Sequence, residues 1–170
     1  MKSAELDSDY FRLIMDNVPL KIIVTDTEGI IRYANPGTTR LTGYSIDEIL
    51  GKTPKLWGGQ MDKSFYENLW NTIKKDKKTF SAEIINKRKN GEKYVARITI
   101  KPITDKNGKL AGFLDIEEDI TDFKRLSDRL HARTRELEML YDPSTGPASK
   151  IKELKGLIGM LESQLSGQWV

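Results

Sequence analysis

The chain has 170 residues, with 28 lysines and arginines against 25 aspartates and glutamates, one histidine and no cysteine. This length suits one compact domain of ~100–150 residues with additional segments. The lack of cysteine excludes disulfides, thiolate nucleophiles and iron–sulfur clusters, and the net charge of +3 is too small to indicate a nucleic-acid partner. No apolar run approaches the ~20 residues that cross a membrane, and the acidic start lacks a signal peptide's apolar core, so we expect a cytoplasmic protein with no membrane partner.

The first part of the chain predicts a helix, a hairpin and short helical turns. Residues 9–18 carry apolar side chains at helical spacing. Two β-branched runs, 20–25 and 30–34, flank a turn that contains aspartate and glycine, as expected for a hairpin. Residues 37–50 then predict short helices, and the second of these begins with a Ser-x-x-Glu capping box at 45–48.

The middle of the chain predicts a longer helix and three strands. Apolar residues recur every four positions within 62–75, which indicates a helix. Strand patterns follow at 80–89, 94–103 and 110–119, and the Asn90-Gly91 pair after the first of them is typical of a type I′ hairpin turn. The order of elements predicts an α+β domain whose five-stranded antiparallel sheet has helices gathered on one face.

Beyond the last strand the pattern becomes that of a coiled coil. From Phe123 onward, apolar residues alternate at spacings of three and four, forming a heptad seam over 123–141 that Arg133 interrupts. A narrow seam needs a partner helix, so we expect a parallel homodimer that Arg133 weakens. Residues 142–149 predict a turn, and 150–166 predict a second amphipathic helix that folds back or extends the oligomer.

Short motifs along this framework occur in a familiar order and spacing. After an N-terminal tail at 1–8, residues 9–122 resemble a PAS domain. The residues that carry the resemblance are Val24-Thr25-Asp26 with Gly29, Tyr33-Ala34-Asn35-Pro36, Leu41-Thr42-Gly43-Tyr44-Ser45, Glu48 to Pro54, Leu69-Trp70, Asn86 to Gly91, and Asp119-Ile120-Thr121.

The resemblance implies sensing and signal transduction. PAS domains enclose a ligand or cofactor between the sheet and the small helices, or bind nothing and serve as dimerisation platforms. We therefore expect a sensor that binds a small ligand or cofactor and relays its state through a dimeric coiled coil to an effector such as a diguanylate cyclase or histidine kinase domain. The alternatives are an FAD-binding redox sensor and a cofactor-free dimerisation or interaction domain. An enzyme is not indicated, because one histidine and no cysteine supply no nucleophile–base pair or metal cluster.

Three side chains outside the last strand are candidate ligand contacts. Asn86 shares an apolar file with Phe80 and Ala82, so its amide needs a polar partner, and the matching asparagine contacts the flavin ring in flavin-binding relatives. A role that only ties down the hairpin stays open. Trp70 matches a tryptophan that contacts flavin in some relatives and packs the core in others. Trp57 lies in a loop rich in glycine and proline, where it either closes the pocket or lines its rim.

The strand at 110–119 allows two orientations. Apolar alternation by itself turns Leu114 and Ile116 toward the core. The family register turns the intervening side chains inward instead, namely Phe113, Asp115 and Glu117. We follow the family register, which places one or two carboxylates near Asn86 in a partly apolar cavity, where an unpaired charge is costly.

Two cofactor chemistries conflict with the residues present. Light-sensing flavin PAS domains form an adduct through a cysteine at the position of Pro54, so adduct photochemistry is excluded. Haem PAS domains ligate iron through a core histidine, whereas His131 lies in the coiled-coil segment, which argues against haem. Residues 141–146 resemble the opening of a diguanylate cyclase (GGDEF) domain, but too few residues follow for its catalytic site, so no activity is inferred.

Overall fold

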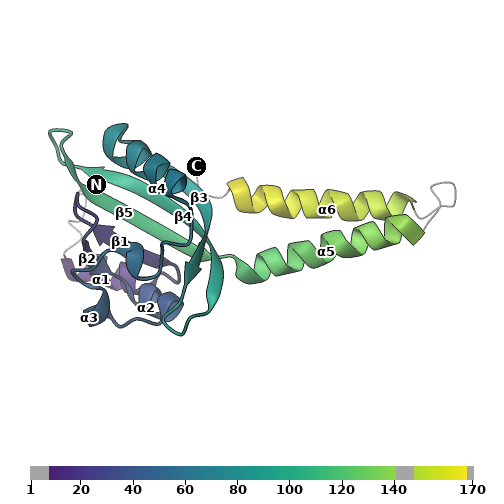
Figure 1. Ribbon diagram of the computed structural model, residues 1–170, viewed down its shortest axis with the longest axis horizontal. Coiled ribbons are helices and arrows are strands. Elements are labelled where there is room, and N and C mark those ends of the chain that lie inside the picture. Colours follow the sequence, from purple (N-terminus) through teal and green to yellow (C-terminus); the bar gives the residue numbers. More distant parts are fainter. Residues whose placement is uncertain (1–7, 141–147, 168–170) are drawn as a thin grey trace, which may run out of the picture. The chain divides into compact units, whose positions relative to one another are not determined.

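The computed structural model describes residues 8–140 and 148–167, which belong to two compact units, Met1–Ile120 and Thr121–Val170 (Figure 1). Residues 1–7 of the expected tail, most of the expected turn and the GGDEF-like opening at 141–146 lie outside the described residues, and Ser8 is the first residue of a helix. The helical elements of the first unit are α1 (Ser8–Asn17), α2 (Pro36–Thr42), α3 (Ile46–Ile49), the 3₁₀ turn η1 (Pro54–Leu56), α4 (Lys63–Trp70) and the π-helical turn η2 (Asn71–Lys75). Its strands are β1 (Lys21–Thr25), β2 (Ile31–Ala34), β3 (Phe80–Lys87), β4 (Lys93–Thr104) and β5 (Leu110–Asp119).

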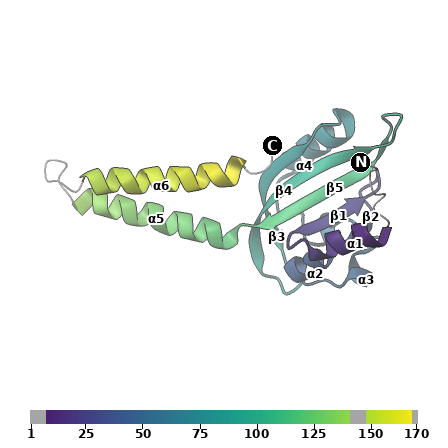
Figure 2. The same cartoon turned by 180° about the vertical axis from the view of Figure 1, so that it is seen from behind.

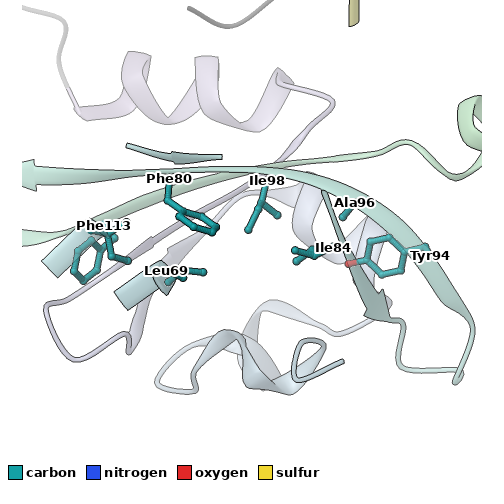
Figure 3. Close-up of a cluster of buried hydrophobic side chains, with 8 residues drawn as sticks. Leu69, Phe80, Ile84, Tyr94, Ala96, Ile98 and Phe113 are labelled. Atoms are coloured by element: carbon teal, nitrogen blue, oxygen red, sulfur yellow. The ribbon is translucent and has the colours of Figure 1, made fainter. Parts of the chain in front are cut away.

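The five strands form one antiparallel sheet in the order β2-β1-β5-β4-β3, which confirms the predicted fold class. β5 lies at the centre and pairs with both β1 and β4. The core side chains of β3, β4 and β5 point to one side of the sheet, and α1 lies on the other side (Figure 3). Seen from behind, α1 is in front of the sheet and α4 is beyond it (Figure 2).

Buried Asn35 joins the start of β1 to α2. Its Oδ1 accepts the backbone N–H of Ile22 at 2.9 Å and that of Thr38 at 3.1 Å, and its Nδ2 donates to the carbonyl of Leu20 at 2.9 Å. Besides capping the N-terminus of α2, Asn35 therefore satisfies the hydrogen bonds of backbone groups at the start of β1. This explains why an asparagine directly follows the β2 strand.

Two apolar clusters lie on the concave side of the sheet. One spans η2 and α4 with β3, β4 and β5, and its buried members are Leu69, Ile73, Phe80, Ile84, Tyr94, Ala96, Ile98 and Phe113 (Figure 3). The other joins β1 and β2 to α3 and the loop after η1, through Ile23, Ile31, Ala34, Ile49 and Trp57. Helices α3 and α4 therefore bury their apolar faces against different halves of the sheet.

The turn between β3 and β4 differs from the expected type I′ turn. A two-residue type I′ turn needs positive φ at both central residues. Here five residues connect the strands, Gly91 donates its N–H to the carbonyl of Arg88 at 2.9 Å, and Gly91 takes φ +91 while Asn90 does not have positive φ. The expectation was wrong because one left-handed residue suffices in this longer loop.

The second unit is an antiparallel helical hairpin of α5 (Thr121–Leu140) and α6 (Ala148–Gly167), so the second helix folds back on the first (Figure 1). Lys155 lies 2.5 Å from Glu138, and Glu162 accepts a hydrogen bond from Ser127 at 3.2 Å. Three α5 residues that contact α6 are each offset by one position from the heptad seam, namely Ser127, His131 and Glu138. Buried Thr134 lies on the same stripe. One residue is ~100° of helix rotation, so the two stripes are adjacent. On the seam itself, Leu126 and Arg133 are exposed, whereas Phe123, Leu130 and Leu137 are half-buried.

Gly112 is the position in β5 where a side chain cannot be accommodated. A Cβ there would lie 2.0 Å from the carbonyl oxygen of Thr25 on β1, well inside van der Waals contact. Gly112→Ala should therefore lower the free energy of unfolding by about 3 kcal/mol or more, because the backbone of β1 must move. Thermal and urea denaturation measure the loss.

The matched control is Gly156→Ala in α6, where an added Cβ meets no atom within 4 Å. Alanine is the better helix former by ~1 kcal/mol, so this variant should be as stable as the parent chain or more stable. Equal stability of Gly112→Ala and the parent would contradict the close strand approach.

Candidate functional site

A cavity of about 390 Å³ lies between the concave side of the sheet and the segments that cover it. Both apolar clusters contribute to its wall, through side chains such as Ile23, Leu69 and Ile98. The segment of η1 and the following glycines close one side, and α4 closes another. A concave, mostly apolar chamber with a few inward polar groups is the usual form of a small-molecule site.

The structure brings the six candidate side chains together at this cavity. All of them line it: Asn86, Trp70, Glu117, Asp115, Trp57 and Phe113. The family register of β5 is therefore correct, and Leu114 and Ile116, which apolar alternation favoured, are half-buried on the opposite side. That these six residues hold a ligand stays a prediction.

The two tryptophans border the cavity in different ways. Trp57 is 2% exposed and packs in the cluster with Ile31 and Ile49. Trp70 is 39% exposed and meets the ring of Phe113 edge-on, with 5.9 Å between ring centroids. Both remain wall residues, so the cavity stays open beside them.

A buried lysine that was not among the predicted site residues lies behind the cavity wall. Lys21 on β1 is 1% exposed, and its Nζ donates to Asp115 Oδ2 at 2.9 Å and to Glu117 Oε2 at 2.5 Å. The same Nζ lies 4.9 Å from the ring centroid of Trp57. The available signal was strand alternation, which places Lys21 on the same file as buried Ile23.

Glu117 is the centre of a wider polar cluster. Its Oε1 accepts hydrogen bonds from Asn86 Nδ2 at 3.1 Å and from the hydroxyl of Tyr94 at 2.6 Å. Asn86 therefore does more than tie down the hairpin, since it bonds across the sheet from β3 to β5. Two buried oxygens of the cluster, Asn86 Oδ1 and Asp115 Oδ1, have no hydrogen-bond partner.

Burial and mutual attraction set the charge states in this cluster. Burial lowers the pKa of Lys21, but the adjacent Asp115 and Glu117 carboxylates outweigh that effect, and the pKa stays above the ordinary value of 10.5. Burial raises the pKa of Asp115 above 3.8; Lys21 lowers it and nearby Glu117 raises it further. Burial, together with the adjacent Glu117 charge, also raises the pKa of Tyr94, so its hydroxyl stays protonated as a donor.

Arg88 extends the polar contacts toward the end of β5. Its guanidinium lies 4.5 Å from the ring centroid of Tyr94, and its Nη2 donates to Asp119 Oδ2 at 2.5 Å. It also donates to the carbonyl of Leu41 on α2. A continuous series of contacts therefore runs from the cavity wall to Asp119, the last residue of β5.

Removing the lysine from the cluster should destabilise the fold. Lys21→Met leaves two buried carboxylates without a counter-charge, so the free energy of unfolding at neutral pH should fall by about 3–5 kcal/mol. Because the pKa of Lys21 is raised above 10.5, this contribution is fully present below pH 10.5 and is lost only as the pH rises through the raised value. Urea denaturation from pH 7 to pH 11 measures both effects.

The control combines Lys21→Met with Asp115→Asn and Glu117→Gln. This set removes all three charges at nearly unchanged volume, so most of the lost stability should return. If Lys21→Met alone were as stable as the parent chain, the ionic cluster would not have the role given to it.

Two further features bear on the kind of site. Within residues 8–140 and 148–167, no group of three or more histidine, aspartate or glutamate side chains is arranged to hold a metal ion. Over the same ranges, every helix is too short or too polar to cross a membrane.

Comparison with known proteins identifies the first unit. The PAS domain family model matches residues 19–122. A nitrogen fixation regulatory protein of Klebsiella oxytoca is 31% identical over 121 residues, which cover 71% of this chain and 24% of that protein. A blue-light-activated histidine kinase of Brucella canis is 30% identical over 118 residues, covering 67% of this chain and 24% of the kinase. The chain thus spans about a quarter of the length of these relatives.

The solved structures agree with this match. The crystal structure of a PAS domain from Colwellia psychrerythraea superposes with a TM-score of 0.61 at 25% identity, covering 67% of this chain and 97% of that one. The sheet order, the helices over its concave side and the family match lead to the same assignment. The chain belongs to the PAS domain family, whose members are typically sensory and signalling modules.

Proposed function

We propose that this PAS domain is a sensor that binds a small molecule in its cavity and passes the bound state to an effector domain. The observation that carries the proposal is the cavity of about 390 Å³ with two buried, unpartnered oxygens beside it. Buried polar atoms without partners cost free energy, and a ligand that reaches them removes that cost. A cofactor-free interaction domain has no comparable reason to keep an open chamber.

The cluster around Glu117 supplies a route from the ligand to the end of the domain. A ligand that moves Asp115 or Asn86 also alters the hydrogen bonds of Glu117. Glu117 accepts hydrogen bonds from Asn86, Tyr94 and Lys21. Arg88 then links Tyr94 to Asp119, two residues before α5 begins. Signalling requires that the ligand favour one of two arrangements of this junction.

The effector we infer is a histidine kinase or diguanylate cyclase domain in the cytoplasm. The Brucella canis relative is named as a histidine kinase and the Klebsiella oxytoca relative as a regulatory protein, and this chain matches about a quarter of each. The domain itself supplies recognition and transmission.

FAD is a second candidate occupant, which would make the protein a redox sensor. The unpartnered Asn86 Oδ1 can accept a hydrogen bond from a ring N–H, and Trp70 and Phe113 offer aromatic walls for a planar ring. When bound, a flavin supplies electron-transfer chemistry, and the wall residues orient the ring and exclude water. Flavin absorption in the purified protein distinguishes this candidate from a colourless metabolite.

Filling the cavity should abolish ligand retention. Ile98 on β4 lines the cavity and is 3% exposed, so Ile98→Phe occupies ligand space. Native mass spectrometry of the parent chain should detect a bound small molecule, and this variant should lose it. The matched control is Ile85→Phe, at a position on β3 that is 43% exposed and outside the cavity lining, where retention should be unchanged. Equal occupancy in all three proteins, or none in the parent, would argue against a ligand sensor.

Transmission through a homodimer is the other part of the proposal. On α5, Leu126 is 57% exposed, and Arg133 on the same seam is exposed and paired with Glu136 at 2.6 Å. These two exposed positions, Leu126 and Arg133, are the part of the seam that we propose meets a second copy. Arg133→Leu should therefore tighten the dimer by about tenfold, since an apolar residue replaces a charge at a seam position.

Analytical ultracentrifugation over a range of concentrations measures this change. Arg135→Leu is the control, because this exposed position lies about half a helix turn from the seam. An unchanged dissociation constant for Arg133→Leu, or an equal gain for Arg135→Leu, would count against the seam as the dimer contact.

A further inference from the structure

The polar cluster at the cavity wall has free hydrogen-bond acceptors, whereas its donors are in use. Lys21 uses two of its N–H groups on the carboxylates, and its ammonium also faces the ring of Trp57. The amide N–H of Asn86 and the hydroxyl of Tyr94 are both used on Glu117. The buried side-chain groups left without a partner in this cluster are two oxygens, Asn86 Oδ1 and Asp115 Oδ1.

The orientation of the Asn86 amide is determined by its neighbour. Nδ2 lies 3.1 Å from Glu117 Oε1, which also accepts the hydroxyl of Tyr94. A flipped amide would place two oxygens against each other, so the oxygen of Asn86 is the atom left over. Asn86 is 1% exposed and Asp115 7% exposed, so water at the protein surface does not satisfy either group.

The net charge of the cluster is also unbalanced, toward the negative. With all groups ionised, Lys21 contributes one positive charge against the two negative charges of Asp115 and Glu117. The other charged residues of the cavity lining are Glu28 and Lys55, which are opposite in sign and not buried. The inner end of the cavity therefore carries an excess negative charge.

We propose that the cavity binds an organic cation whose head group donates hydrogen bonds to Asp115 Oδ1 and Asn86 Oδ1, such as an ammonium or amidinium group on an apolar body. The inference rests on the proposed ligand-sensing function and names its ligand class. The apolar body contacts the aromatic wall of Phe65, Trp70 and Phe113. An anionic head group would meet two bare oxygens, because Lys21, the buried cation beside them, is already bound to both carboxylates.

The state of Asp115 agrees with this assignment. Burial raises the pKa of this carboxyl above its ordinary value, even with Lys21 adjacent. A cation bound at its free oxygen stabilises the ionised form and offsets the burial. A positively charged ligand at this oxygen would therefore favour ionised Asp115.

Three probes of nearly equal size and shape test the head group: benzamidine, benzamide and benzoate. They present donors only, a mixture of donors and acceptors, and acceptors only, on the same phenyl ring. Isothermal titration calorimetry on the dialysed full chain should give benzamidine the lowest dissociation constant, at least about tenfold below that of benzoate, as expected for a charge-assisted contact. Equal or tighter binding of benzoate or benzamide overturns the inference.

Two variants locate the contact. Asp115→Asn removes the excess negative charge at constant shape, and Asn86→Leu removes the second acceptor. Each variant should raise the dissociation constant of benzamidine by about tenfold. Each should also reduce the difference in affinity between benzamidine and benzoate. Glu28→Gln at the exposed part of the lining is the control and should leave all three affinities unchanged. An unchanged benzamidine affinity in Asp115→Asn overturns the inference, and the parent chain's preference among the probes tests it even if a variant fails to fold.

The failure of this inference is distinguishable from the failure of the sensor proposal. If native mass spectrometry finds a retained neutral or anionic molecule, the cation assignment is wrong and the ligand-sensing function stands. If none of the three probes binds and nothing is retained, both are wrong.

Discussion

The buried ionic cluster of Lys21, Asp115 and Glu117 is the constraint on which the rest of the site depends. Three charges at the centre of the sheet are tolerable only if they stay paired, and the pairing joins β1 to β5. Asn86 and Tyr94 extend the same contacts to β3 and β4. Four of the five strands thus meet at one carboxylate, so the inner wall of the cavity and the central register of the sheet depend on the same bonds.

The apolar residues that support the fold differ from those that leave polar atoms free at the cavity. The apolar clusters support the sheet and its covering helices, while the cavity between them retains a small number of unsatisfied polar atoms. A fully apolar chamber would bind any hydrophobic molecule of suitable size. In the sensor that we propose, the free oxygens of Asp115 and Asn86 instead make binding dependent on the chemistry of the ligand's head group. The contacts of Arg88 with Tyr94 and Asp119 connect the same cluster to the end of β5.

The helical hairpin changes how the C-terminal segment is understood. The heptad pattern of α5 predicted a helix that needs a partner, and α6 provides one within the chain. It does so on the stripe through Ser127 and Thr134, while Leu126 on the seam stays exposed. One side of α5 is therefore occupied by α6, and the homodimer proposal rests on the exposed seam positions Leu126 and Arg133.

The sequence alone determined the number and order of the strands, the helical character of 62–75 and the coiled-coil pattern, because these depend on local periodicity and turn residues. It did not show that the helix at 62–75 divides into α4 and the π-helical turn η2. The inward side of β5 followed only from family resemblance, because apolar alternation by itself favoured Leu114 and Ile116, which lie on the opposite side. Tertiary structure decided that Lys21 is buried, since its partners lie more than ninety residues away in the chain. It also decided which oxygens have no hydrogen-bond partner, because that depends on which acceptor each donor around Glu117 uses. Residues that are neighbours in the sequence do not reveal these contacts.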